Sequence, residues 1–387
     1  MKQHSLVKTL PVFMAFYVMG FVDIAGVATN YVKMDFDLSN TVTQILTMMI
    51  FVWFALLSIP IGVFQDKKGK KLTVNLGILF TAAGMLAPVI FYNYYSMLVS
   101  FVLLGIGNTI VQVSASPLMQ DVSSPDKLSR NLTFSQFVKA IAGILGPVIA
   151  MFCAVNFGKW TIVYWVYLTI CIISILCLYH TRIEEKEAIG RATVRSTLRL
   201  LCNKRVALLT TGTFLMVGFD VGMNTNIINY LRTSFAVSQE EAGIGISVYF
   251  AGLMAGRFLS ALILNKVQGN KMLLFCAVLS IFAFVALYLT MNFQGGQAII
   301  FLIGLFSAAI FPLIFSAGLQ YMPQRANELS GLMIMSVCGG AVIPPFVGVL
   351  IDKFGVMEGL ALLGLCLAYV IFLAVYMLRQ DFHINKK

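Results

Sequence analysis

Four ionisable side chains lie inside long apolar stretches of the sequence, away from its polar segments. Two are acids and two are bases: Asp23, Asp220, Lys139 and Arg257. An unpaired charge in a bilayer costs about 3 kcal/mol or more, so each group is expected to face a cavity or a partner. A carboxylate in such a place can bind a proton, and a nearby cation changes the affinity for that proton. The pattern therefore favours proton binding coupled to a second event.

Amide and aromatic side chains occur at helical spacing in the same apolar stretches. Asn30 follows Asp23 by seven residues, which places both on one face of a helix. Amides can replace the water hydrogen bonds of a hydroxyl-rich ligand, and aromatic rings can cover its apolar faces. The candidates for ligand contact are Asn30, Asn108, Gln112, Lys139, Asn224, Asn226, Asn229, Phe311 and Phe315. For the two phenylalanines, packing between helices is the more common explanation.

The elements that must position these residues are long apolar helices. Of the 387 residues, 59% are apolar and 11% are charged, and the mean hydropathy is +0.89. A soluble domain carries about 25% charged residues, whereas twelve spans of about 20 apolar residues would use about 240 positions. The sequence therefore predicts an all-α membrane protein and excludes an ordinary soluble enzyme, a disordered chain and a disulfide-rich secreted scaffold.

Twelve spans are predicted from the apolar runs and the polar interruptions between them. They cover residues 10–32, 41–64, 72–92, 96–118, 131–154, 159–179, 206–231, 241–265, 271–291, 297–319, 329–351 and 358–379. The longest polar interruption separates six spans from six. We therefore expect an N-terminal six-helix bundle over residues 1–180, a cytoplasmic linker over 181–205 and a C-terminal six-helix bundle over 206–387.

A weak internal repeat indicates that the two halves are related. Residues 18–32 read VMGFVDIAGVATNYV, and residues 216–231 read MVGFDVGMNTNIINYL. Each segment has Gly-Phe, then an acid, then Asn and Tyr about ten residues later. Two pseudo-symmetric halves are typical of membrane transporters.

The basic residues are distributed unequally between the two sets of loops. If the N-terminus lies inside, 21 of the 27 Lys and Arg fall in the termini and cytoplasmic loops, and four fall outside. This bias predicts a multi-pass protein of the inner membrane with both termini in the cytoplasm. It also explains the net charge of +11, because the basic residues hold the cytoplasmic loops at the inner face of the lipid bilayer. No nucleic-acid partner is needed to account for this charge.

The segment between the second and third spans carries a motif. Residues 62–71 read GVFQDKKGKK, which fits GxxxD[RK]xG[RK][RK]. The motif resembles a signature of the major facilitator superfamily. Its glycines permit a tight turn and close helix approach, its acid can cap or pair at a helix end, and its bases hold the loop inside. The gating or structural positions that it implies are Gly62, Asp66, Gly69, Lys70 and Lys71.

Strings in the second half resemble one family within that superfamily, the fucose/glucose/galactose:proton symporters. They are VGFDV at 217–221, INYL at 228–231, GRF at 256–258, FPLIFS at 311–316, SGLMIM at 330–335 and GGAVIP at 339–344. The resemblance covers essentially the whole chain and implies the major facilitator fold, with twelve helices in two pseudo-symmetric six-helix bundles. It also implies proton-coupled uptake of a sugar by alternating access, with the proton as coupling ion and no other cofactor.

The first half departs from this family where substrate contacts are expected. Asp23 lies about one turn before the family's acid in the first span, and Gln112 stands where members commonly have a Glu. Asp23 remains the first candidate for the proton site and Asp220 the second, although either could be a structural or locking residue. Lys139 could extend to the inner interface, neutralise Asp23 or bind an acidic substrate, whereas Arg257 suits a structural or gating pair.

Two rival functions remain open. Lys139 and Gln112 suggest an acidic or N-acetylated sugar, or another small organic anion, as the cargo. A non-transporting membrane sensor or a membrane enzyme is more remote, because no catalytic constellation and no long soluble segment is present. The three histidines, His4, His180 and His383, lie near ends or in loops, so we expect no metal site, and we expect a monomer.

Overall fold

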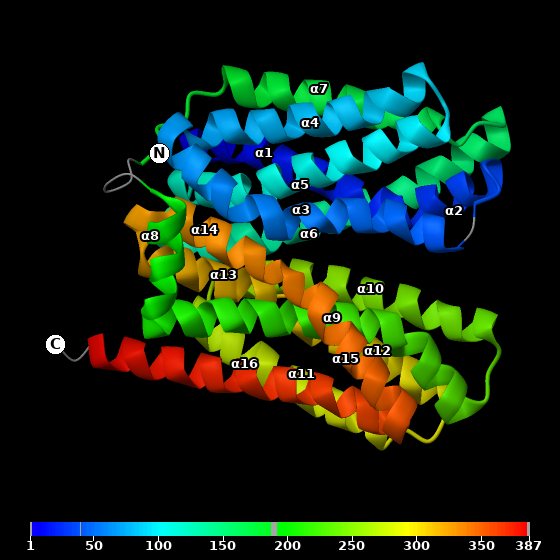
Figure 1. The fold of residues 1–387 in the computed structure, drawn as a ribbon. Helices are drawn as coiled ribbons and strands as arrows, with labels where there is room; N and C mark the ends of the chain where they lie inside the picture. The colour runs from blue at the N-terminus through cyan, green and yellow to red at the C-terminus, as the bar shows by residue number, and fades with distance from the viewer. Residues whose placement is uncertain (1, 39, 187–191, 385–387) are drawn as a thin grey trace. The chain divides into compact units, whose positions relative to one another are not determined.

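The computed structural model describes residues 2–38, 40–186 and 192–384. Within these ranges it describes the side chains of all residues except 2–7, 25–27, 30, 40–48, 51, 239–240 and 381–384. In these ranges every regular element is a helix (Figure 1). The first half contains α1 (Lys2–Met19), η1 (Gly20–Ile24), α2 (Ala25–Asp35), α3 (Asn40–Lys68), α4 (Lys70–Ile90), α5 (Tyr94–Val122), α6 (Pro125–Phe157) and α7 (Ile162–His180). The linker contains α8 (Val194–Arg199) and η2 (Leu200–Cys202). The second half contains α9 (Lys204–Phe235), α10 (Gln239–Ile263), α11 (Gly269–Tyr288), α12 (Phe293–Ser307), α13 (Ile310–Tyr321), η3 (Pro323–Arg325), α14 (Ala326–Met335), η4 (Ser336–Cys338), α15 (Gly339–Phe354) and α16 (Val356–Ile384).

Ten helical segments in the described ranges are long and apolar enough to cross a membrane. They are Lys70–Ile90, Tyr94–Val122, Pro125–Phe157, Ile162–His180, Lys204–Phe235, Glu241–Ile263, Gly269–Tyr288, Phe293–Tyr321, Pro323–Phe354 and Val356–Gln380. They coincide with the third to twelfth predicted spans. The first predicted span is formed by α1, η1 and α2, and the second by α3. Helices are the expected solution in lipid, because each satisfies its own backbone hydrogen bonds.

The chain forms two compact units, and each borrows a short segment from the other half of the sequence. Unit 1 contains Met1–Pro125, Ser135–Arg199 and Met322–Met335. Unit 2 contains Asp126–Phe134, Leu200–Tyr321 and Ser336–Lys387. The two exchanged segments open the fifth and the eleventh predicted spans, which are equivalent positions in the two halves. The sequence boundaries at residues 180 and 206 therefore remain a prediction that does not account for this exchange.

Three predicted spans are interrupted. The first span changes to a 3-10 helix at Gly20–Ile24, the tenth is broken between α12 and α13, and the eleventh contains η4. The break in the tenth span precedes Pro312, which has no N–H to donate to the carbonyl of Ala308. The break in the eleventh span precedes the pair Gly339-Gly340, whose helix propensity is low.

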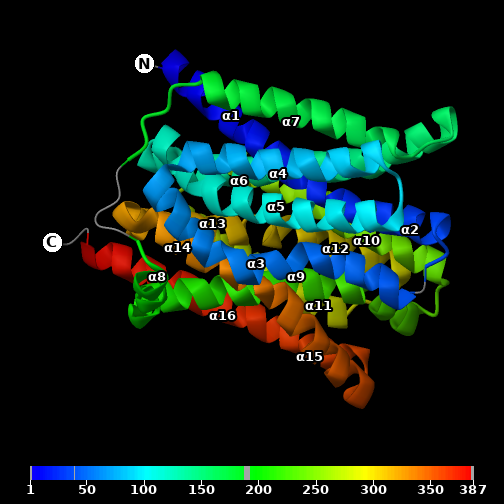
Figure 2. The ribbon, with the colours of Figure 1, turned by 45° about the horizontal axis from the view of Figure 1, so that its top comes forward.

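Unit 1 is built around α5, which packs against α1, α3 and α4, while α7 packs against α1 and α4 (Figure 2). Its core includes fully buried aromatic rings on η1, α5 and α7, among them Phe21, Phe101 and Tyr167. The Phe21 and Tyr167 rings are stacked, with centroids 3.8 Å apart. This stack fixes the interrupted part of the first span against α7.

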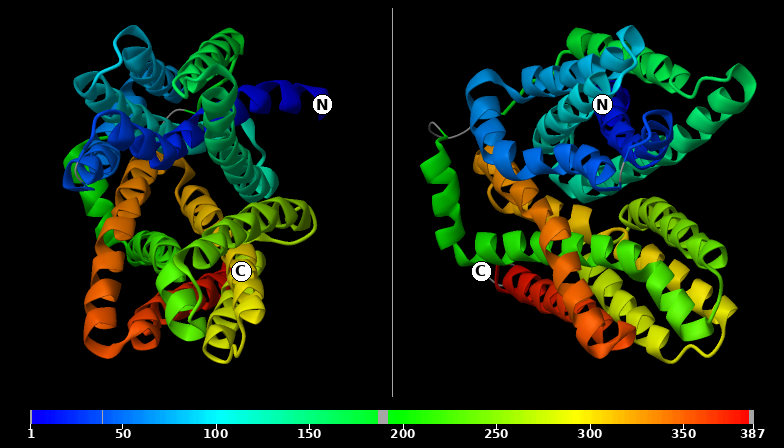
Figure 3. Two further views of the ribbon diagram at one scale, coloured as in Figure 1. Left: turned by 90° about the vertical axis from the view of Figure 1, so that its right-hand side faces the viewer. Right: turned by 45° about the vertical axis from the view of Figure 1, so that its right-hand side comes forward.

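Unit 2 is built around α9, which packs against α10, α13, α15 and α16. In Figure 3, α9 is the long green helix that lies beside the red α16. Phe219 of α9 meets Phe284 of α11 edge to face, with ring centroids 6.0 Å apart. Nearer the end of α9, the Tyr230 hydroxyl donates a 2.9 Å hydrogen bond to the carbonyl oxygen of Leu287. These contacts fix the part of α9 that contains the candidate site residues Asp220, Asn224, Asn226 and Asn229.

Candidate functional site

Asp23 lies in the 3-10 segment that interrupts the first span, and its side chain is exposed. The segment rests on α6, because a Cβ atom added at Gly143 would lie 2.6 Å from Asp23 Oδ2. A Cβ atom at Gly20 would overlap the carbonyl oxygen of Lys139 on the same helix. The acid therefore sits where the first span meets the glycine-containing face of α6, a position that the sequence spacing alone did not reveal.

Asn108 and Gln112 lie one turn apart on α5, and η1 contacts this helix. Their side chains are 4% and 8% exposed. Within the described ranges, Asn108 Oδ1 and Gln112 Oε1 are buried and accept no hydrogen bond. Buried amide oxygens normally have a partner, so these two are suited to bind a donor such as a ligand hydroxyl.

Lys139 is partly buried on α6, one turn before Gly143 and therefore on the same side of the helix. The structure thus brings Asp23 and the Lys139 segment together within unit 1. Asn30 lies on α2, but its side chain is outside the described part of the structure.

Asp220 of unit 2 differs from Asp23 in its surroundings. Its carboxylate accepts a hydrogen bond from the hydroxyl of Tyr249, which lies on α10 and is 1% exposed. Arg257 is partly buried on α10, eight residues after Tyr249 and thus on the same face. Asp220 is therefore linked to the neighbouring helix of its own unit.

The remaining candidates of unit 2 fall into two groups. Asn224 is partly buried, and its Oδ1 has no hydrogen-bond partner in the part of unit 2 that the structure describes. Asn226 is 7% exposed, and its Nδ2 donates to the carbonyl oxygen of Gly222 at 2.9 Å. Asn229 is exposed.

The two phenylalanine candidates lie one turn apart on α13. Their ring centroids are 5.9 Å apart, and the rings are tilted relative to each other. Phe315 is 2% exposed, so its ring belongs largely to the core of unit 2, whereas Phe311 is partly exposed.

The motif at residues 62–71 forms the turn between α3 and α4. Gly69 has a φ of +94°, which favours glycine because a side chain would be strained there. The first backbone N–H groups of α4, at Lys70 and Lys71, donate to the carboxylate of Glu185 at 2.5 and 2.9 Å. Glu185 follows α7, so the start of the linker caps α4 and its negative charge suits a helix N-terminus.

The two motif lysines bind other helices of unit 1. Lys70 Nζ lies 2.5 Å from a carboxylate oxygen of Asp121 at the end of α5, and the two side chains are 5% and 1% exposed. Lys71 Nζ donates to the carbonyl oxygens of Tyr179 and Thr181 at 2.9 and 2.8 Å, where α7 ends. The basic motif thus ties α4 to α5 and α7 rather than facing water alone.

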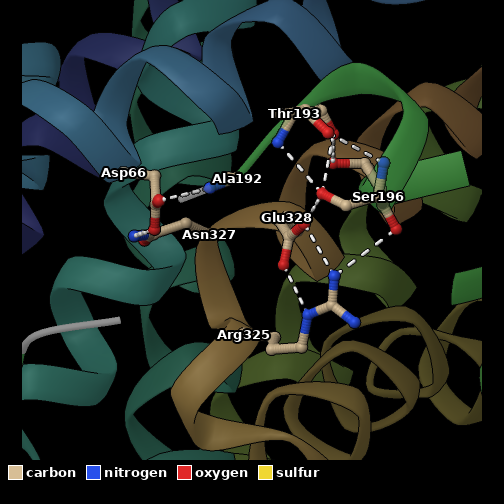
Figure 4. A network of polar contacts seen from close by, with 8 residues as sticks. Asp66, Ala192, Thr193, Ser196, Arg325, Asn327 and Glu328 are labelled. Carbon is tan, nitrogen blue, oxygen red and sulfur yellow. Dashed lines mark hydrogen bonds and ion pairs between the residues drawn. The ribbon is translucent and has the colours of Figure 1, made fainter. Parts of the chain in front are cut away.

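Asp66 joins the motif to two distant segments (Figure 4). One oxygen accepts a 3.0 Å hydrogen bond from Nδ2 of Asn327 on α14, and the other accepts one of 3.0 Å from the backbone N–H of Ala192 in the linker. The helices α3 and α14 approach closely here, since a Cβ atom at Gly62 would lie 3.2 Å from the Cα of Gly331.

An ion pair between η3 and α14 extends this network. Arg325 Nε lies 2.6 Å from Glu328, and the Ser196 hydroxyl of α8 donates to Glu328 at 2.5 Å (Figure 4). We name the assembly of Asp66, Ala192, Ser196, Arg325, Asn327 and Glu328 the linker-end network. All of these residues belong to unit 1.

Sequence reasoning missed several partners of the predicted residues. They are Asp121, Glu185, Tyr249 and Asn327. Glu185 and Asp121 lie next to apolar runs and carry a weak signal, because an acid at the end of a span can pair with the motif lysines. Within the described ranges, no group of three His, Cys, Asp or Glu side chains is arranged to hold a metal ion.

Known proteins resemble the chain over nearly its whole length. A glucose/galactose transporter of Brucella abortus is 24% identical over 379 residues, covering 92% of this chain and 90% of the relative. A putative glucose/galactose transporter of Helicobacter pylori is 25% identical over 396 residues, covering 95% of each. An L-fucose-proton symporter of Haemophilus influenzae is 20% identical over 381 residues, covering 88% of each.

Among solved structures, the transporter FucP in its outward conformation has the same fold. The TM-score is 0.84 at 16% identity, with 96% of this chain and 99% of that chain covered. The sequence profile described as Major Facilitator Superfamily matches residues 12–345. The all-helical fold and the resemblance expected from the motifs are therefore confirmed, and the chain belongs to the major facilitator superfamily of membrane transporters.

Proposed function

We propose that this protein takes up a sugar together with protons across the inner membrane, with both termini in the cytoplasm. Secondary transport by alternating access opens one binding site to each side of the membrane in turn. Support comes from the sugar transporters and the fucose-proton symporter among the relatives. The observation that carries the proposal is Asp23, an exposed acid at the break in the first span, in a unit whose helix α5 holds two buried amide oxygens without partners.

Asp23 is the proton site in this proposal. The residue is exposed, and it lies on the α6 segment that carries Lys139. A cation nearby favours the ionised carboxylate, and a bound ligand that changes this pairing changes the proton affinity. Asp220 is the second candidate, and its hydrogen bond from buried Tyr249 favours a structural or locking role, with Arg257 on the same face of α10.

The amides predicted from the sequence supply the sugar contacts in this proposal. A sugar exchanges its hydrogen bonds to water for bonds to protein, and buried oxygens that still lack a donor are the natural partners of its hydroxyl groups. Asn108, Gln112 and Asn224 meet this condition. Asn30, Asn226 and Asn229, with Phe311 and Phe315, complete the proposed set of contacts.

The linker-end network acts as a gate on the cytoplasmic side in this proposal. Asp66 binds both α14 and the linker, and α14 comes from the other half of the sequence. Breaking these contacts would let α14 leave α3 when the cytoplasmic side opens. The motif lysines and Gly69 keep the α3–α4 turn in place during this movement.

The test is uptake of radiolabelled glucose, galactose and fucose into proteoliposomes, with and without an inward proton gradient. We expect a gradient to raise the accumulated sugar above equilibrium. In Asp23→Asn, accumulation should fall to the equilibrium level, whereas sugar counterflow, which needs no net proton movement, should persist. Equal uptake with and without the gradient in the natural protein contradicts proton coupling. Accumulation that survives in Asp23→Asn moves the proton site elsewhere.

An acidic or N-acetylated sugar is the second candidate cargo. Lys139 favours it, because its segment of α6 contacts the Asp23 segment and a lysine there can bind a carboxylate. Competition of uptake by uronates and sialic acid against galactose and fucose separates the two cargoes. If an acidic sugar is carried, Lys139→Gln should weaken its uptake at least tenfold relative to the uptake of neutral sugars.

A further inference from the structure

The hydroxyl of Tyr167 is a buried hydrogen-bond donor to which the proposed transport mechanism assigns no role. The residue lies on α7 and is 1% exposed. Its hydroxyl oxygen is buried and has no hydrogen-bond partner among the described residues. A phenol buried without a partner costs free energy, so a group that it binds in another state of the protein is expected nearby.

The Tyr167 ring is held rigidly against the segment that carries Asp23. It stacks on Phe21 with an interplanar angle of 5° and ring centroids 3.8 Å apart. Phe21 in turn meets Tyr17 of α1 edge to face, with centroids 5.6 Å apart. Phe21 and Asp23 lie two residues apart in η1, so the position of the phenol is fixed relative to the carboxylate.

Two glycines of α6 make room for both oxygens. A Cβ atom at Gly143 would lie 2.6 Å from Asp23 Oδ2, and one at Gly146 would overlap the Tyr167 hydroxyl. Gly143 and Gly146 are three residues apart, so the two Cβ positions lie about 5–6 Å from each other on one face of the helix. The carboxylate and the phenol therefore share one notch in α6.

We propose that Tyr167 is a positioning residue for the proton site and that its hydroxyl donates a hydrogen bond to Asp23 when Asp23 is ionised. This inference rests on one part of the proposed function, namely that Asp23 binds the proton. On deprotonation, the Asp23 proton leaves to water, and Tyr167 keeps its own proton and turns it toward the carboxylate. On protonation, the carboxyl group no longer needs the donor and is free to reorient with the break in the first span.

Other ionisable groups near the notch must be considered. Tyr17 of α1 meets Phe21 edge to face, and Tyr164 lies three residues before Tyr167 on α7. Lys139 lies on α6, where a Cβ atom at Gly20 would overlap its carbonyl oxygen. On α4 and α5, the ionisable side chains lie only near the helix ends. A cation such as Lys139 would stabilise an ionised carboxylate in the same direction as a hydrogen-bond donor does, so the test must remove the phenol alone.

The test compares Tyr167→Phe with Tyr164→Phe and Asp23→Asn in reconstituted protein without any sugar. Tyr167→Phe keeps the ring stack on Phe21 and removes only the hydroxyl. Tyr164→Phe is the matched control, because this residue lies on the same helix, is fully buried and also has a hydroxyl without a partner. Infrared difference spectra over pH follow protonation of carboxyl groups, and subtracting the Asp23→Asn spectra isolates the Asp23 signal.

We expect Tyr167→Phe to move the Asp23 titration midpoint about one pH unit higher, a tenfold gain in proton affinity, because the ionised form loses a donor. Tyr164→Phe should leave the midpoint unchanged. If Tyr167→Phe does not assemble, Gly143→Ala provides a second variant, and displacement of Asp23 from the notch should also move the midpoint. An unchanged midpoint in the variant used, or an equal shift in Tyr164→Phe, overturns the inference.

The same spectra separate this inference from the proposed function. If no Asp23 signal titrates, Tyr167 has no proton site to serve and the inference is wrong, whatever the uptake assay gives. If Asp23 titrates and responds to Tyr167→Phe while uptake in the natural protein ignores the proton gradient, proton-coupled transport fails and the inference stands.

Discussion

The buried ion pair between Lys70 and Asp121 gives the sharpest test of how the motif works. The two side chains are 5% and 1% exposed and lie 2.5 Å apart, so each charge depends on the other for solvation. Removing one partner leaves a buried charge without its counterion, which costs about 3–5 kcal/mol. Replacing both by apolar residues removes the buried charges together and is close to neutral. We therefore expect Lys70→Met and Asp121→Leu to destabilise the protein strongly and the double variant to recover most of the loss.

The magnitude can be converted to an unfolding temperature. For a unit of about 200 residues, 1 kcal/mol changes the midpoint by about 2–4 °C. Each single variant should therefore unfold at least about 6 °C below the natural protein. Thermal unfolding of purified protein in one detergent, followed by a thiol-reactive dye, measures the change, because four of the free cysteines are buried. The double variant should unfold within about 3 °C of the natural protein.

Two results would refute this reasoning. Single variants that lose less than 2 °C would mean that the pair is solvated by water and contributes little, as exposed pairs do. Additive losses in the double variant would mean that each side chain stabilises the protein through other contacts. For Lys70 such a contact exists, because its Nζ also donates to the carbonyl oxygen of Lys186 at 3.3 Å.

Two further predictions concern a close helix contact and the ionisation of a tyrosine. Gly331→Ala should weaken the approach of α14 to α3, because the added Cβ atom would lie 2.7 Å from the Ser58 carbonyl oxygen. Faster proteolysis of the linker should report this change, whereas the control Gly243→Ala, at a site with open space around it, should show none. Burial and the hydrogen bond to Asp35 raise the pKa of Tyr92 above its usual value of 10. The folded state thus keeps this proton longer than the unfolded chain, so the stability from this group is full below pH 10 and falls as pH rises further. Tyr92→Phe should flatten the alkaline loss of unfolding temperature, and an unaltered pH profile would contradict this account.

The sequence by itself determined the helices and their approximate limits. In lipid a backbone must satisfy its own hydrogen bonds, so a long apolar run with few charges has one stable form, and the run can be read without its neighbours. The tight turn at Gly69 was also predictable, because its motif requires glycine, and the structure gives it a φ of +94°. Asp66 was predicted to cap or pair at a helix end, and the structure gives it hydrogen bonds from Ala192 and Asn327.

Only the tertiary structure decided which distant groups meet. Asp66 and Asn327 are 261 residues apart and Lys70 and Glu185 are 115 apart, and no periodicity in the sequence encodes such pairs. The sequence has no proline within Gly20–Ile24 that would predict the break there. The contact of Asp23 with Gly143 depends on how α6 packs against this segment. Helix formation is local because its hydrogen bonds join residues four apart, whereas a binding site depends on side-chain packing between helices that lie far apart along the chain.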